Sequence, residues 1–150
     1  MTALLQRLQP GEVLHGPARR MTLARVLALS GGPLDKPGWP DRNLHTDHAA
    51  AVAAGLDGIV VSGTQWEGHL AGFLVDIFGR HWFGGGEFKV KVPRSVRLDD
   101  TLQPVVRCED VEHTAGAALY QLAVWCENAA GEQVLVGTAQ CRVPATTGDA

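Results

Sequence analysis

The chain has 150 residues, of which 45% are hydrophobic and 19% charged, an ordinary globular composition. This length predicts one domain that folds without disulfides or structural metals. The formal net charge of −3 excludes a general polyanion binder, so we expect no nucleic-acid partner. The three cysteines form no CxxC pair, which fits neither a disulfide framework nor a zinc cluster. We expect buried thiols and no metal.

The sequence shows no sign of a membrane span or a secretory leader. A span needs about 18 consecutive apolar residues, and no apolar run is that long. The first twenty residues lack the long apolar core of a signal peptide. We therefore expect a cytoplasmic protein with no membrane partner. Residues 1–150 are expected to form a single domain, with a flexible tail from about Ala145.

The first third of the chain predicts short elements separated by turn residues. Two prolines and a glycine make Leu34–Arg42 irregular. A threonine or aspartate lies at the start of each predicted helix and suits its N-cap position. In chain order we expect a strand over Glu12–Arg19, a helix over Met21–Leu29 capped by Thr22, and a second helix over His48–Ala54 capped by Thr46 or Asp47.

The strongest predicted element is a helix over Gly63–Phe78. Its large apolar residues recur at helical spacing and form one broad stripe. A second face carries small residues, which predicts a helix buried over most of its circumference. The stripe consists of Trp66, Leu70, Phe73, Leu74 and Ile77.

After three consecutive glycines the hydrophobic period changes to two, which predicts strands. Short connections join the last strands, so we expect an antiparallel sheet. The predicted class is α+β, with one long central helix wrapped by this sheet. The expected strands contain Phe88, Val90 and Val92, then Leu102–Asp110, Ala117–Glu127 and Glu132–Val143, with a turn over Asn128–Gly131.

The densest group of polar side chains lies between the two predicted short helices, in residues 41–48. Its two aspartates and two histidines supply an acid, a base and an orienting partner. Structural roles suit the same residues, because Asp41 follows a proline and favours a turn, and Asp47 caps the next helix. Both interpretations stay open from composition alone.

The start of the long helix is a candidate carbonyl-binding or anion-binding site. The first N–H groups of a helix lack an intrahelical acceptor and carry a partial positive charge. Gly63 has no Cβ, so a ligand oxygen can approach its backbone N–H closely. The alternative is that Ser62 is a plain N-cap and Gly63 a packing glycine.

These segments form one pattern: Asp41–Asp47, then Ala49, Ala50, Ala54 and Gly55, then Ser62 and Gly63, with Gly85–Pro93 and Leu98–Leu102 downstream and Pro10–Glu12, Met21 and Thr22 upstream. The pattern resembles the MaoC-like acyl dehydratases, the (R)-specific enoyl-thioester hydratases with a hot-dog fold. Their motif is Asp-x-Asn-Pro-(Leu/Ile)-His-x-Asp, followed by an alanine-rich helix and by His-Gly. The resemblance runs from about Pro10 to Val143 and implies the hot-dog fold.

The chain departs from this motif in its polar segment. The proline after Asn43 is missing, so Asp41 and His45 are four residues apart instead of five. Either the loop takes another route that still joins them, or Asp41 is not the family acid.

Two further departures lie on either side of that segment. Ser62 stands where the family has a histidine before the glycine. An insertion over Pro33–Pro40, which contains Trp39, is expected to form a lid or a pocket wall.

The resemblance implies the reversible addition of water to a 2-enoyl thioester, giving a 3-hydroxyacyl thioester, a lyase reaction of fatty acid metabolism. It implies no metal or redox cofactor, and coenzyme A or phosphopantetheine enters as part of the substrate. It also implies a homodimer, which would cover a long unpaired strand edge.

The resemblance also implies roles for individual residues. His45 holds or deprotonates the water and returns a proton, Asp41 orients it or acts as partner base, and Asn43 shapes the loop or positions His45. The Gly63 N–H stabilises the enolate oxygen. Ser62 and Thr64 complete this carbonyl site, and Trp39, Trp66 and Phe73 are candidate walls of the acyl slot, with core packing as the alternative for each.

Two other functions stay open. A hot-dog thioesterase activates water with a carboxylate on or near the central helix, and Glu67 is the candidate. The alternative for Glu67 is a helix-favouring residue in the first turns, stabilised by the helix dipole. The second function is a non-catalytic subunit that binds acyl thioesters.

Overall fold

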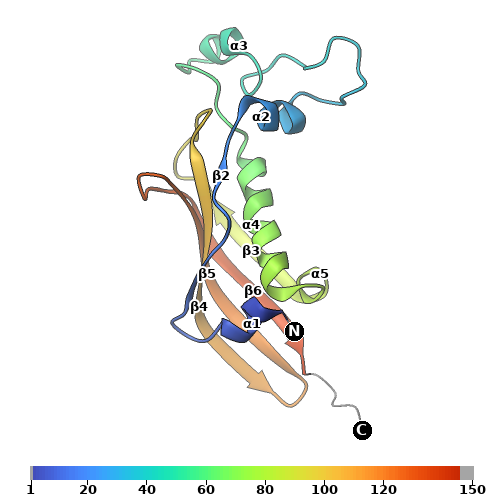
Figure 1. The fold of residues 1–150 in the computed structure, drawn as a ribbon, viewed down its shortest axis with the longest axis vertical. Helices are drawn as coiled ribbons and strands as arrows, with labels where there is room; N and C mark the ends of the chain where they lie inside the picture. The colour runs from blue at the N-terminus through green and yellow to red at the C-terminus, as the bar shows by residue number, and fades with distance from the viewer. Residues whose placement is uncertain (1, 146–150) are drawn as a thin grey trace.

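The computed structural model describes residues 2–145 and consists of one sheet with a long helix across its face (Figure 1). Six antiparallel strands follow the order β1-β4-β5-β6-β3, and β2 also pairs with β4. This confirms the predicted α+β architecture. The elements are α1 (Ala3–Arg7), β1 (Val13–His15), β2 (Arg19–Arg20), α2 (Leu23–Ser30), α3 (His48–Ala53), α4 (Gly63–Phe78), α5 (His81–Gly85), β3 (Gly86–Lys91), β4 (Thr101–Thr114), β5 (Ala117–Asn128) and β6 (Gln133–Pro144).

The last three strands form a meander of 14, 12 and 12 residues. The predicted turn between β5 and β6 is confirmed, and the Asn128 side chain accepts hydrogen bonds from the backbone of Ala130 and Glu132. Strand β4 continues to Thr114, beyond the predicted end at Asp110. A bulge after Cys108 shifts the register, and pairing with β5 then resumes.

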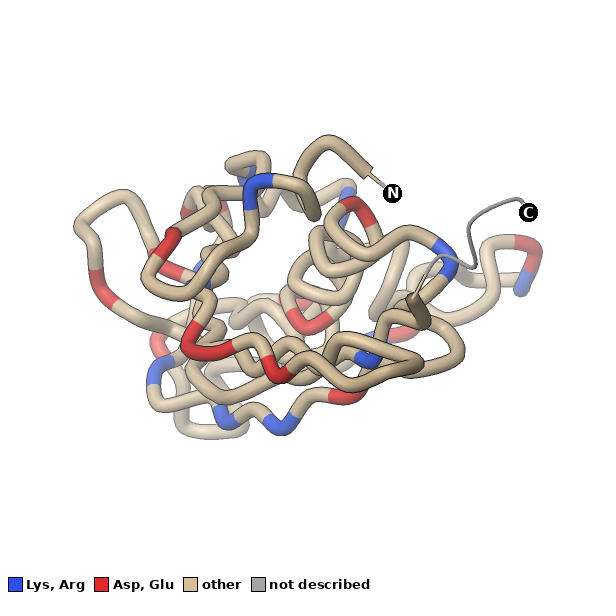
Figure 2. The backbone as a smooth tube through the Cα atoms, turned by 90° about the horizontal axis from the view of Figure 1, so that it is seen from below, with Lys and Arg blue, Asp and Glu red and all other residues tan. Residues whose placement is uncertain are grey.

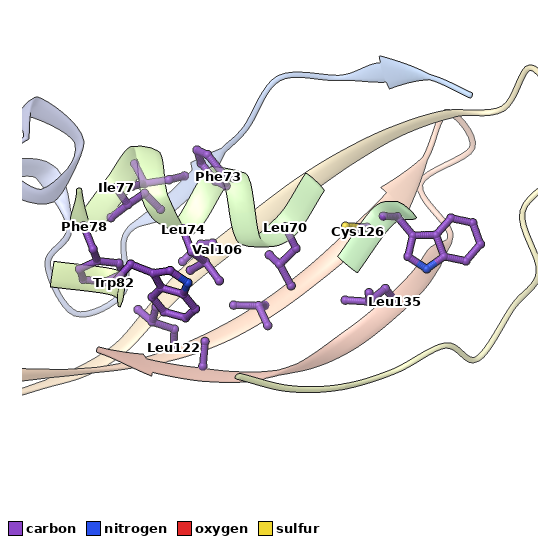
Figure 3. Packing of buried hydrophobic residues seen from close by; sticks show 14 of the residues in the cluster. Leu70, Phe73, Leu74, Ile77, Phe78, Trp82, Val106, Leu122, Cys126 and Leu135 are labelled. Carbon is purple, nitrogen blue, oxygen red and sulfur yellow. The ribbon is translucent and has the colours of Figure 1, made fainter. Parts of the chain in front are cut away.

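Helix α4 buries its predicted apolar stripe against the sheet. Figure 3 shows Leu70 and Leu74 on the side of the helix that faces Val106 and Leu122. Both leucines have no exposed surface. Because this stripe recurs at helical spacing, the sequence alone placed its residues in the core.

The predicted strand over Glu12–Arg19 is wrong in its middle. The structure has two short strands, β1 and β2, separated by Gly16, Pro17 and Ala18. Pro17 has no N–H to donate to a ladder. Gly16 approaches the sheet so closely that an added Cβ would lie 2.7 Å from Pro104 and 2.8 Å from Phe73.

Two short helices escaped the sequence analysis. Helix α1 is capped by Thr2, whose hydroxyl also donates to the Ile77 carbonyl near the end of α4. The signal available in the sequence was the three-residue spacing of Leu5 and Leu8, both of which the structure buries. Helix α5 contains two glycines and forms because Trp82 stacks between Phe78 and Phe88, with ring centroids 6.1 and 6.2 Å away.

The segment from α2 to α3 projects beyond the end of the sheet (Figure 1). We call residues 31–62, which include α3, the overhang. The helix predicted just before the overhang and the one within it are both confirmed, since Thr22 caps α2 and Asp47 caps α3 through their side chains. The overhang leads directly into the first residue of α4.

Figure 2 shows acidic and basic positions interspersed along the backbone in that view. The cysteines Cys108, Cys126 and Cys141 are free and buried, as predicted. Burial raises the pKa of Cys126 to about 12 and that of Cys141 to about 11. No described helix is long and apolar enough to cross a membrane. The predicted tail lies outside the described residues from residue 146 onward.

Candidate active site

Asn43 organises the polar segment of the overhang. Its side-chain amide donates to the Ser30 carbonyl at 2.9 Å, which ties the segment to the end of α2. Its side-chain oxygen accepts the backbone N–H of His45 at 2.8 Å. The Asn43 backbone N–H in turn donates to the Thr46 hydroxyl at 2.9 Å. The amide therefore fixes the backbone that carries His45.

The imidazole of His45 is oriented by a backbone carbonyl. Its Nδ1 lies 2.7 Å from the Val60 carbonyl oxygen. A carbonyl only accepts, so Nδ1 carries the proton in this contact. In neutral His45 the Nε2 therefore holds a lone pair, the form that a general base needs. The sequence analysis did not find the role of Val60, which carries no side-chain signal.

The same strip of chain that holds His45 leads into α4. The Val61 N–H donates to the Val96 carbonyl at 2.8 Å, and Val60 forms an antiparallel bridge with Arg97. Gly63 follows Val60 by three positions. The catalytic candidate His45 and the helix start are thus fixed to one short anchored segment.

The first turn of α4 leaves its leading donors free of side-chain capping. Ser62 occupies the N-cap position without capping the helix, and its hydroxyl lies 2.9 Å from that of Thr64. An added Cβ on Gly63 would meet Val92 at 3.5 Å and the Trp66 Nε1 at 3.7 Å, which are ordinary contacts. Packing therefore does not require glycine at position 63.

Asp41 points into the insertion rather than forming a hydrogen bond with His45. Its backbone N–H donates to the Gly31 carbonyl at 2.8 Å, which closes residues 31–41 into a compact loop. Its carboxylate lies 2.6 Å from the Lys36 ammonium. An added Cβ on Gly32, where φ is +77°, would lie 2.5 Å from the other carboxylate oxygen.

No hydrogen bond or ion pair of the described residues joins Asp41 to His45. The carboxylate of Asp41 faces Lys36 and Gly32 within the loop, and two residues later the Asn43 side chain bonds to Ser30 and His45. The sequence analysis missed Lys36, although an ammonium five residues before an aspartate was an available signal.

Asp47 has the structural role that the sequence left open. Its carboxylate accepts the Ala50 N–H at 2.8 Å and lies 3.0 Å from the Arg42 guanidinium. The hydrogen bond from Arg42, followed by that from Ala50, holds the pKa of Asp47 below its usual value. Asp47 therefore stabilises α3 and the end of the polar segment.

The three aromatic candidates for the acyl slot differ in their surroundings. Trp66 and Phe73 are 1% and 4% exposed and belong to the core, the alternative stated above. Trp39 is half-buried in the loop, and its enclosed Nε1 makes no hydrogen bond to the described residues. Of the three, Trp39 alone stands outside the core cluster.

Glu67 lies one helical turn after Gly63 and is half-buried. It takes part in none of the six ion pairs between described residues. Within residues 2–145, no three His, Cys, Asp or Glu side chains converge in a way that suits a metal ion.

Comparison with known proteins gives structural matches only. No family model and no curated protein sequence matches the chain. The chain is similar to the MaoC-like dehydratase from Rhodospirillum rubrum, with 21% identity, a TM-score of 0.70, and coverage of 93% of this chain and 95% of that one. The chain is also similar to a monoamine oxidase regulatory protein from Archaeoglobus, with 17% identity, a TM-score of 0.72, and coverage of 97% of this chain and 96% of that one. A third similar structure is the (R)-hydratase PhaJ1 from Pseudomonas aeruginosa, with 15% identity, a TM-score of 0.69, and coverage of 97% of this chain and 92% of that one.

These likenesses establish the fold. The chain has the hot-dog fold of the MaoC-like dehydratases, as the sequence resemblance implied. At 15–21% identity they transfer no residue role, so the roles of the site residues rest on the geometry given above.

Proposed function

We propose that the protein is an acyl-thioester hydratase or dehydratase, which adds water reversibly to a 2-enoyl thioester. One observation carries the proposal: the Nδ1 of His45 bonds to the Val60 carbonyl at 2.7 Å, on the strip that leads into the start of α4. This contact supports a lone pair on Nε2 and ties the ring to Val60, three positions before the free backbone donors that begin at Gly63. The hydratase and dehydratase among the structural neighbours favour the same chemistry.

In the hydration direction, His45 takes a proton from water through Nε2 while the water oxygen bonds to C3. The C2=C3 electron pair moves toward the thioester carbonyl. When the enolate collapses, C2 takes up the proton that His45 removed from the water, and His45 returns to its neutral form. The enolate oxygen is stabilised by the Gly63 N–H, with the Thr64 N–H beside it. Ser62 shapes this end through its contact with the Thr64 hydroxyl.

Asp41 is the proposed second acid–base group, and its ion pair with Lys36 must open before it reaches the substrate. Both side chains are about half exposed, with 44% for Asp41 and 50% for Lys36. Pairs of this kind contribute at most about 1 kcal/mol, so binding of a substrate is sufficient to open it. Asn43 acts as a positioning residue for His45.

The proposed substrate carries coenzyme A or phosphopantetheine, and no separate cofactor is proposed. Trp39, in the loop over residues 31–41, is the proposed wall of the acyl slot that stands outside the core. The free, buried thiols fit a reducing compartment and support a cytoplasmic location.

We also propose a homodimer that pairs through β3. This strand ends the sheet and bonds to β6 on one side only. An antiparallel pairing centred on Lys89 places Glu87 of each copy opposite Lys91 of the other, and Phe88 opposite Val90. These charge and apolar pairs outweigh the single Lys89–Lys89 contact at the centre.

The test is an absorbance assay with crotonyl-CoA and a longer 2-enoyl-CoA. Loss of enoyl absorbance without release of free thiol is the expected result. His45→Ala should lower the rate by roughly 10²–10⁴-fold. Asp41→Asn tests the second acid–base group. His48→Ala, in which an exposed histidine of the same segment is removed, serves as the matched control and should leave the rate unchanged.

A thioesterase is the second candidate, because Glu67 lies one turn from Gly63 without an ion-pair partner. In that case the same assay releases free CoA, and Glu67→Gln abolishes the release. If neither product forms, while acyl-CoA still binds, the protein is the non-catalytic subunit and the enzymatic proposal is wrong.

A further inference from the structure

A small pocket lies on α4 away from its start. It is bounded by the connection between β1 and β2, by α4 and by β4, and its volume is about 200 Å³. Pro17, Phe73 and Pro104 give it an apolar floor. His69, on its wall, is six residues beyond Gly63, which is about 9 Å along the helix axis. The pocket is therefore separate from the helix start.

His69 has unused hydrogen-bonding capacity. Its Nε2 is enclosed and has no hydrogen-bond partner among the described residues. Burial, and then the charges of Arg19 and Arg25, hold the pKa of His69 below its usual value. A polar atom of this kind is rare in a folded protein without a bound water or ligand.

The charge around His69 is positive at one end of the pocket. Arg19 lines the pocket and, like Arg25, takes part in none of the six ion pairs between described residues. The next residue, Arg20, is paired with Asp99 at 3.0 Å. Within residues 2–145 no side-chain hydrogen bond or ion pair uses the Arg19 guanidinium, so its donors are available to an acceptor from outside.

The negative end lies at Asp76, which also lines the pocket. It follows His69 by seven residues, or about 10 Å along the helix. Gly68 and Gly72 also line the pocket, and an added Cβ on either would meet no atom within 4 Å, so the helix wall is open. An anion is therefore favoured at the His69 end and repelled from the other.

The volume limits what the pocket holds. Pockets for whole small molecules have about 300–1,000 Å³, and this one has about 200 Å³. It takes one charged group rather than a complete cofactor. A guanidinium fork matches the oxygens of a tetrahedral oxyanion.

We propose that this pocket binds a phosphate group between Arg19 and His69. The phosphate is either free in solution or part of a pantetheine-bearing molecule; only the second source rests on the proposed function.

The experiment is a titration of the whole chain with inorganic phosphate at fixed ionic strength, followed by the amide signals of Gly68 and Gly72 in NMR spectra. Saturable shifts of both signals are expected. Arg19→Gln should weaken binding roughly tenfold or more, the usual effect of losing a charge-assisted hydrogen bond. His69→Gln tests the second contact.

Arg20→Gln is the matched control, because it removes the same charge from the neighbouring position. It should change phosphate affinity by less than about twofold, the scale of a screened charge. Equal weakening by Arg19→Gln and Arg20→Gln would show general charge attraction and overturn the proposal. The absence of saturable shifts in the unchanged protein would overturn it as well.

Parallel titrations with pantetheine 4′-phosphate and with pantetheine distinguish the sources. If pantetheine 4′-phosphate binds more tightly than both inorganic phosphate and pantetheine, the pocket holds the phosphate of the substrate's pantetheine arm. Equal affinity for the two phosphates assigns a free anion. These titrations measure binding and need no turnover. Their outcome therefore tests the phosphate proposal even if the hydratase proposal is wrong.

Discussion

The sheet with α4 and the overhang are stabilised by different forces. In the first region, α4 packs on the sheet through apolar side chains that have almost no exposed surface, such as Leu70, Leu74 and Leu135. In the overhang, side chains bond to backbone groups a few residues away, as Asn43 does to His45. The first region determines the shape of the molecule, and the second carries its proposed chemistry. Substitutions in the two regions should therefore affect different measurements.

The largest expected effect is on the stability of the core. Leu70→Ala removes a fully buried side chain of α4 and should lower the free energy of unfolding by about 2–5 kcal/mol. Urea denaturation followed by circular dichroism measures this loss. Leu34→Ala, at an overhang leucine that is 70% exposed, should stay within about 0.5 kcal/mol. If both variants lose a similar free energy of unfolding, the claim that different forces stabilise the two regions is wrong.

At the start of α4, where the two regions meet, a substitution should change the hydration rate and leave the stability unchanged. Gly63→Ala adds a methyl group with only ordinary contacts at 3.5 and 3.7 Å, so the melting temperature should hold. The methyl group obstructs a carbonyl oxygen at the helix start, and hydration should slow by roughly 10–100-fold. Gly84→Ala, at an exposed glycine with open space around it, is the control. Unchanged hydration in Gly63→Ala would exclude Gly63 as the carbonyl site.

Within the overhang, Asn43 should couple activity to local order. Asn43→Ala removes the bonds to the Ser30 carbonyl and to the His45 N–H, at a cost of about 1–2 kcal/mol. The hydration rate should fall because His45 loses its fixed backbone. Asn43→Asp keeps an acceptor for His45 and should recover part of that rate. If the two variants lose the same rate, the acceptor has no positioning role.

The smallest effect should come from the charge of Asp47. Its folded-state pKa lies below the ordinary value of 3.8, first because of Arg42. The ionised group therefore adds stability above pH 3.8, and this contribution is lost as the pH falls through the folded-state pKa. Asp47→Asn keeps a capping acceptor and removes the charge.

The stability difference between the unchanged protein and Asp47→Asn should therefore be constant near neutral pH and vanish in acid. Thermal melts across this pH range measure it. Asp35→Asn, at an exposed aspartate of the same overhang, is the control. A difference that persists at the lowest pH would show that capping geometry, rather than charge, is responsible.

The two regions also differed in how far the sequence predicted them. Helix α4 and strands β5 and β6 were predicted within one residue at each end, because their buried residues repeat at fixed spacing, whereas β4 runs four residues beyond its predicted end. Helix α5 was not, since its glycines disfavour a helix and the stacking of Trp82 is a tertiary contact. The single strand predicted over Glu12–Arg19 was wrong at Pro17, because proline cannot donate a hydrogen bond to a neighbouring strand.

In the overhang the sequence identified the residues but not their partners. Asn43 and Asp47 have roles that their side-chain types predict. The partner of His45 is the Val60 carbonyl, a backbone group that every residue carries. The partner of Asp41 is Lys36, because the closure of the loop decides which way the carboxylate faces. Such pairings depend on the path of the chain, which no spacing rule specifies.

The order of the elements along the chain has a consequence for synthesis on the ribosome. Helix α4 precedes β4, β5 and β6, the strands that cover its apolar stripe. Translation proceeds from the N-terminus, so this helix emerges with Leu70 and Leu74 exposed and waits until the meander is complete. Uncovered apolar surface of this kind promotes aggregation of nascent chains. We expect ribosome-bound chains that end before β4 to bind chaperones, and release to coincide with the emergence of β6.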